Sequence, residues 1–182
     1  MNVIHHRSQL SDVTVQGRLI DMIVVPYDTP AWVPDDAGWY REAFSPGAFR
    51  KFENPKLWHR IHLRYEHTPG IPYGRTVDLR SDQQYLRATM KVTHGDSADR
   101  LLAQAADGDI AGVSVAFVPG VDRDDTDHEG PLVRRVTVRH VEEISLTETP
   151  VYADAKVLAT RAHTDQARAD ILRWVQSFRT TV

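Results

Sequence analysis

The chain has 182 residues, of which 41% are hydrophobic and 26% charged, and its formal net charge is -3. This length suits one compact domain, and the composition is typical of a soluble globular protein, which excludes collagen, coiled-coil and wholly disordered classes. No apolar run approaches the roughly 18–20 residues of a membrane span, and the N-terminus lacks the apolar stretch of a secretory signal, so we expect a cytoplasmic protein. Positive charge is not clustered, so we expect no nucleic-acid binding.

The first part of the chain has patterns typical of strands. Residues 13–25 alternate on one phase and then on the other, with Gly17 as a predicted bulge, which suits a closed or sharply curved sheet. Turn residues dominate 28–38. A proline at the first helical position then predicts a short helix over about 46–52.

Three more strands are predicted in the middle of the chain. Residues 62–67 form the first, and its alternation places His67 on the apolar face. Residues 73–80 and 85–92 meet across a turn and predict a hairpin.

The second half mixes a helix with long strands. A helix over 96–107 precedes a strand over 110–118. The acidic residues over 119–130 could bind calcium, but the glycine that an EF-hand loop needs is missing. We therefore expect a solvated hairpin tip there. Residues 132–146 then predict one long strand. From Thr164 on, apolar residues at helical spacing predict an amphipathic helix.

Ser114 is the most suggestive nucleophile, because the chain has no cysteine. On its strand, Gly112 and Ala116 are its neighbours on the same face, so a substrate backbone could reach its hydroxyl. The competing interpretation is a small core residue at a close approach of two elements. A nucleophile elbow is excluded, because the strand runs on instead of turning into a helix.

A serine nucleophile needs a base, and His67 and His140 are the candidates. Each follows apolar residues at strand spacing, so each imidazole would be partly desolvated. Such histidines are also common as hydrogen-bonded core residues.

A metal site is the alternative use of the histidines. His59, His62 and His67 with Glu66 offer imidazole and carboxylate ligands. The helical spacing of metalloproteases is missing, however, and a strand would point His62 and His67 to opposite faces. We therefore expect no metal and no other cofactor.

Four segments, in this order and spacing, resemble the prohead (procapsid maturation) serine proteases of tailed bacteriophages, a family related to the herpesvirus assemblins. They are FSPGAF over 44–49, LRYEHTPGIPYGRTV over 63–77, DGDIAGVSVAF over 107–117, and VEEISLTETP over 141–150 followed by ADA over 153–155. The resemblance implies an assemblin-like antiparallel β-barrel with peripheral helices. It also implies a catalytic histidine, a serine and, from the assemblins, a second histidine in that chain order.

Residue by residue, the family's histidine falls on His67 and its serine on Ser114. Thr68 stands where the family often has aspartate, and Ala116 stands where it often has glycine. Neither difference removes a catalytic group, although Ala116 puts a methyl group beside the nucleophile.

The third catalytic residue has two candidates, His140 and Glu143. Strand phase favours His140, which continues the face of Val138, whereas Glu143 lies on the opposite phase unless a bulge intervenes. Glu143 could instead form an ion pair with Arg139 or with an arginine of a neighbouring strand. The candidate hydrogen-bond donors of the oxyanion hole are a backbone amide near Ser114 or Thr147, and the side chain of Arg75.

The resemblance implies a serine endopeptidase that cleaves capsid or scaffold proteins in the interior of an assembling procapsid, in the host cytoplasm. We expect a protease β-barrel domain over 1–160 and, over 161–182, a C-terminal amphipathic helix that packs on the barrel or on a partner, such as a second copy in a homodimer. The alternatives are a non-catalytic capsid assembly factor on the same fold and a metal-dependent hydrolase.

Overall fold

The computed structural model describes residues 4–6, 18–35, 38–152 and 156–161, and strands dominate it. In chain order the elements are β1 (Ile4–His6), β2 (Leu19–Pro26), β3 (Ala31–Asp35), β4 (Gly38–Phe44), the 3-10 helices η1 (Arg50–Glu53) and η2 (Pro55–Arg60), β5 (His62–Tyr65), β6 (Gly74–Ser81), β7 (Tyr85–Val92), α1 (Asp96–Asp107), β8 (Gly112–Pro119), β9 (Asp122–Asp127), β10 (Gly130–Arg135), β11 (Val138–Thr147) and β12 (Val157–Arg161).

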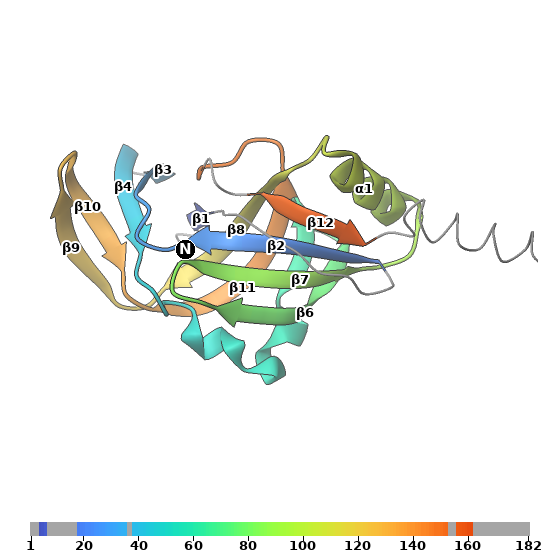
Figure 1. Cartoon of the computed structure of the whole chain (residues 1–182), viewed down its shortest axis with the longest axis horizontal. Helices are drawn as coiled ribbons and strands as arrows, with labels where there is room; N and C mark the ends of the chain where they lie inside the picture. Colours follow the sequence, from blue (N-terminus) through green and yellow to red (C-terminus); the bar gives the residue numbers. More distant parts are fainter. Residues whose placement is uncertain (1–3, 7–17, 36–37, 153–155, 162–182) are drawn as a thin grey trace, which may run out of the picture.

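The main sheet has eight strands in the order β1-β8-β11-β5-β6-β7-β2-β12 and curls into a half-barrel (Figure 1). Its neighbours are antiparallel except β11 and β5, which run parallel. The expected mainly β, barrel-like fold with few helices is therefore confirmed. Three neighbouring inner strands of this sheet, β8, β11 and β5, carry the functional candidates.

The hydrophobic core lies against one face of these central strands. Val115 and Phe117 of β8, Ile144 and Leu146 of β11, and Leu63 of β5 are all 0% exposed and belong to one cluster. Because side chains alternate along a strand, the residues between them point to the opposite face. That opposite face holds the small and polar residues of the central strands.

A second sheet of four strands, in the order β3-β4-β10-β9, projects from one end of the half-barrel (left in Figure 1). Its junction with the half-barrel contains a buried ion pair between Glu42, which is 0% exposed, and Arg135. Arg135 also donates to Asp122 Oδ2 at 2.6 Å and to the Tyr40 hydroxyl at 2.7 Å. Both charges are thereby supplied with hydrogen-bond partners, which a buried ion pair requires.

Local patterns in the sequence predicted several elements well. The hairpin of β6 and β7 is confirmed as an antiparallel pair, and α1 ends at Gly108 in the left-handed conformation. The strand predicted over 110–118 corresponds to β8, and the second part of the strand region predicted over 13–25 corresponds to β2.

Other boundaries differ from the prediction. Residues 28–38 contain the edge strand β3, which tolerates Pro34 because an edge strand needs fewer hydrogen-bond donors. The acidic segment forms β9, paired with β10, and only its tip is a turn. The long strand predicted over 132–146 is divided into β10 and β11, which belong to different sheets. The helix predicted over 46–52 is replaced by a turn and the 3-10 helix η1.

Gly17 and the C-terminal helix predicted from Thr164 lie outside the described residues. The strand β12 reaches Arg161, so the predicted boundary at 160 falls within an element. Within the described ranges, no helix has the length and hydrophobicity to cross a membrane.

Candidate active site

Ser114 is the third residue of β8 and lies on the face opposite the core. Its Cα partner on β11 is Ser145, so the two side chains lie beside each other on that face. Ser114 is nevertheless 0% exposed, and its Oγ is buried without a hydrogen-bond partner in the described part of the chain. The expected small neighbours, Gly112 and Ala116, are also buried.

Two bulges in β11 decide which of its side chains share the face of Ser114. The register with β8 shifts between Val138 and His140 and again between Val141 and Glu143. Each shift inserts one residue, so Val138, Val141 and Ile144 all reach the core although they are three residues apart. Glu143 consequently points to the face of Ser145 and Ser114.

The prediction that His140 shares a face with Val138 and Ile144 is therefore wrong. His140 is exposed, and its Cα partner on β8 is Val118, near the end of that strand. Strict alternation gives the wrong face for His140, because the two bulges shift the phase of β11 on either side of it, whereas Glu143 does lie on the face opposite Val138 and Ile144, as alternation predicts.

His67 lies in a tight turn that follows β5. The Thr68 N–H donates to the Tyr65 carbonyl at 3.0 Å, and the two central residues, Glu66 and His67, have φ values of 46° and 55°. Positive φ at both central positions is the type I′ pattern, which is costly for residues other than glycine, asparagine and aspartate. The Glu66 carboxylate supports the turn by accepting the Glu148 N–H.

This turn moves His67 away from the face that the sequence predicted. Leu63 is in the core, whereas His67 contacts Glu143 on the opposite face. The strand predicted over 62–67 ends at Tyr65, so simple alternation does not extend to His67. Backbone strain of this kind is concentrated at functional sites.

Glu143 accepts two hydrogen bonds on one carboxylate oxygen and forms an ion pair through the other. Oε1 lies 2.6 Å from His67 Nδ1 and 3.0 Å from Ser145 Oγ, and Oε2 lies 2.6 Å from Arg64 Nε. Burial raises the pKa of Glu143, but the hydrogen bonds from His67 and Ser145 and the nearby positive charges outweigh burial, and the pKa lies below its usual range. The carboxylate is therefore ionised at neutral pH.

An ionised carboxylate only accepts hydrogen bonds, so the proton between it and His67 belongs to Nδ1. This fixes the tautomer in which Nε2 is the basic nitrogen, as in the histidine of a serine protease triad. The His67 Nε2 and the Ser114 Oγ are both buried. They do not form a hydrogen bond in this structure, because Ser114 Oγ has no partner among the described residues.

Arg64 and Ser145 are site residues that the sequence analysis did not name. Arg64 bridges two parts of the site, since it pairs with Glu143 and also donates to the carbonyls of Thr68 at 3.2 Å and Gly70 at 2.9 Å. The prediction that Glu143 could pair with an arginine of a neighbouring strand is thus confirmed by Arg64 of β5. Ser145 could have been found from the sequence, because a residue two positions after Glu143 on a strand lies on the same face.

A hollow of about 490 Å³ runs beside the loop that Arg64 supports. The segment from Thr68 to Tyr73 lines one side, and the turn from Thr93 to Ala98 lines the other. The exposed Ile71 stands on this loop. The hollow therefore offers space for an extended chain beside Thr68, the residue that follows His67.

The other candidates take different positions. Arg75 is exposed and lies in one row with His62 and Glu143, as their strand registers show. His59 is exposed on η2, and Glu66 is engaged by the Glu148 N–H. Among the described residues, no group of three or more histidine, aspartate or glutamate side chains could hold a metal ion.

Comparison with known proteins adds one finding. The family model described as caudovirus prohead serine protease matches residues 17–169. Neither a curated protein nor a solved structure matched the chain. The matched range spans every strand from β2 to β12, including those that carry Ser114, Glu143 and the turn of His67, and so the chain belongs to the caudovirus prohead serine protease family.

Proposed function

We propose that this chain is a serine endopeptidase that cleaves capsid or scaffold proteins inside an assembling phage procapsid. In this proposal Ser114 is the nucleophile, His67 the general base, and Glu143 the residue that orients the imidazole. The observation that carries it is the 2.6 Å contact between His67 Nδ1 and Glu143 Oε1, on the face that Ser114 shares.

The proposed chemistry follows from these positions. His67 Nε2 takes the proton of Ser114 Oγ as the oxygen attacks the carbonyl carbon of the scissile peptide bond. The same proton then goes to the leaving amine, and water releases the acyl group from the serine. Glu143 stabilises the imidazolium that forms in between, because its carboxylate remains ionised.

The hydrogen bond between Ser114 and His67 would form when substrate is bound. Catalytic hydrogen bonds are often longer or absent without substrate and tighten in the complex. The hollow beside the loop at Thr68 is where we expect the substrate chain to lie.

The test is co-expression with the major capsid protein and with the scaffold protein of the same phage, followed by mass measurement of all chains. We expect truncation by the wild type, none by Ser114→Ala, and normal truncation by Ser45→Ala, a change in the turn after β4. Intact maturation with Ser114→Ala would instead favour a non-catalytic assembly factor. Loss of truncation on addition of a chelator would favour a metal-dependent hydrolase.

A further inference from the structure

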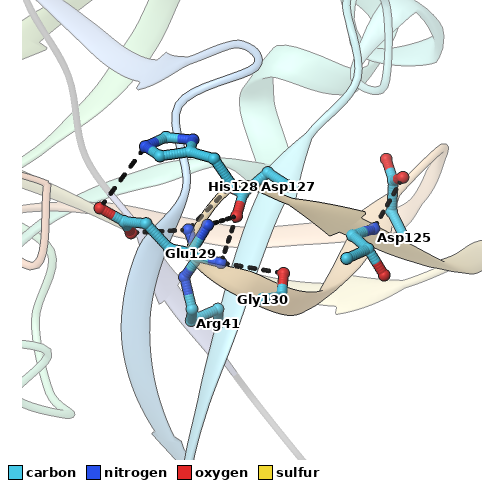
Figure 2. Close-up of polar contacts among 7 residues, drawn as sticks. Arg41, Asp125, Asp127, His128, Glu129 and Gly130 are labelled. Atoms are coloured by element: carbon cyan, nitrogen blue, oxygen red, sulfur yellow. Dashed lines mark hydrogen bonds and ion pairs between the residues drawn. The ribbon is translucent and has the colours of Figure 1, made fainter.

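The four-stranded sheet is built rigidly although it stands away from the half-barrel. Arg41 of β4 is 4% exposed and binds the turn between β9 and β10. It donates to both carboxylate oxygens of Asp127, at 2.6 and 2.7 Å, to Glu129 Oε2 at 2.8 Å and to the Gly130 carbonyl at 3.1 Å. Figure 2 shows these tip residues gathered around the guanidinium. A bidentate pair between a buried guanidinium and a half-buried carboxylate fixes one geometry.

Two large aromatic side chains are exposed on this rigid sheet. Trp32 of β3 is 57% exposed and Trp39 of β4 is 69% exposed. Trp32 is the Cα partner of Arg41, and Pro34 is the partner of Trp39, so both indoles lie on the same face of the hairpin. Neither tryptophan belongs to the hydrophobic core cluster, so folding does not account for them.

The two tryptophans line a groove of about 310 Å³, which we call the tryptophan groove. Pro131 and Val133 of β10 provide further apolar surface. Asp124 of β9 adds an exposed carboxylate, whereas Asp125 is paired with Arg134. Contiguous exposed apolar surface with a polar rim is typical of protein interaction sites, and tryptophan is the residue most enriched at their energetic centres.

Charge decides what kind of partner fits this groove. The one cationic side chain that lines it in the described structure is Arg41, which Asp127 and Glu129 neutralise. Asp124 is exposed. Exposed indole faces attract lysine and arginine, and neighbouring carboxylates add to that attraction. The groove therefore suits a basic side chain flanked by apolar ones and repels nucleic acid.

We propose that the tryptophan groove docks a lysine- or arginine-bearing extended segment of the capsid or scaffold protein, and so tethers the substrate to the enzyme away from the cleavage site. This inference rests on the proposed function for the identity of the partner. Binding of a basic segment does not require catalysis, so the docking proposal and the proposed proteolytic function can be tested separately.

The first experiment measures binding by fluorescence anisotropy with two labelled synthetic peptides, one alternating lysine and leucine and the other glutamate and leucine. We expect the lysine peptide to bind and the glutamate peptide not to bind. Trp39→Ala and Asp124→Asn should each weaken binding of the lysine peptide at least fivefold. Raising the salt concentration should weaken it further, because exposed charges are screened.

Matched controls separate this groove from general surface effects. Val121→Ala removes another exposed hydrophobic side chain, and Asp107→Asn removes an exposed carboxylate from α1. Both controls should bind like the wild type. Binding by Trp39→Ala within twofold of the wild type, or equal losses in Asp124→Asn and Asp107→Asn, would overturn the proposal.

The second experiment compares truncation of the capsid protein in co-expression. Trp32→Ala/Trp39→Ala should slow it severalfold while Val121→Ala leaves it unchanged, and an unaltered thermal melt would show that the double variant is folded. Truncation at the wild-type rate by the double variant would contradict tethering. If the wild-type chain itself truncates nothing, the proposed function fails, and the peptide titration still decides whether the groove binds basic segments.

Discussion

The carboxylate of Glu143 receives donors from three elements of the site. Its partners are His67 in the turn after β5, Ser145 two residues further along β11, and Arg64 on β5. The two hydrogen bonds and the positive charges of the site keep the pKa of Glu143 below its usual range in spite of burial. A permanently ionised acceptor at Nδ1 is what a histidine needs to act as a base through Nε2.

The roles of Glu143 and His140 can be separated by substitution. Glu143→Gln removes the charge that stabilises the imidazolium and no longer enforces the tautomer, so we expect the cleavage rate to fall by a factor of about 10⁴. His140→Ala removes an exposed ring from the same strand and should leave the rate within about twofold. Rates measured on one capsid-derived substrate decide the matter. The reverse order, with His140→Ala the more damaging, would contradict the role given to Glu143.

At the scale of single elements, β11 shows what the sequence could reveal and what it could not. Ser114 and its small neighbours were predictable, because β8 alternates regularly. Glu143 was not favoured, because the catalytic residues were expected on the apolar face of β11, whereas Ser114 and the His67 contact lie on the face opposite the core. The same limit applies to His67, whose position depends on a turn with positive φ that no glycine marks.

Elements specified by local residues were predicted best. The helix α1 has a buried apolar stripe and a glycine stop, and the hairpin of β6 and β7 has alternating strands on either side of a short turn. The second sheet was missed, because β4 and β10 are parallel neighbours separated by almost half of the chain. Such non-local pairing leaves no short-range pattern.

The hairpin of β9 and β10 carries a pH-dependent contact. The hydrogen bonds from Arg41 lower the pKa of Asp127 from its ordinary value of 3.8 to about 2. A carboxylate whose pKa is lowered by folding stabilises the native state above its unfolded pKa, and the contribution is lost as the pH falls from about 4 toward 2.

We therefore expect Asp127→Asn to lower the free energy of unfolding at pH 7, and the difference from the wild type to shrink as the pH approaches 2. Urea denaturation at several pH values measures this difference. Asp124→Asn, which changes an exposed carboxylate of the same strand, should show a smaller effect at pH 7. A difference between Asp127→Asn and the wild type that stays constant down to pH 2 would argue against the ion pair with Arg41.

Considered as a whole, the molecule combines a curled sheet that holds the candidate catalytic residues with a rigid second sheet that projects from it (Figure 1). The buried pair of Glu42 and Arg135 lies where the two meet. Ser114 is fully buried on β8, an inner strand of the curled sheet. This arrangement supports a protease in which partner recognition and peptide cleavage take place on different surfaces.

The central claim is that Ser114 and His67 act as one catalytic unit, and a double-mutant comparison tests it most directly. Cleavage rates of one capsid-derived substrate are measured for Ser114→Ala, His67→Ala and the double variant. We predict that each single change lowers the rate by a factor of about 10⁴–10⁶ and that the double variant is hardly slower than either, because members of a catalytic unit are not additive. Additive losses, or more than a few per cent of wild-type cleavage by Ser114→Ala, would contradict the account.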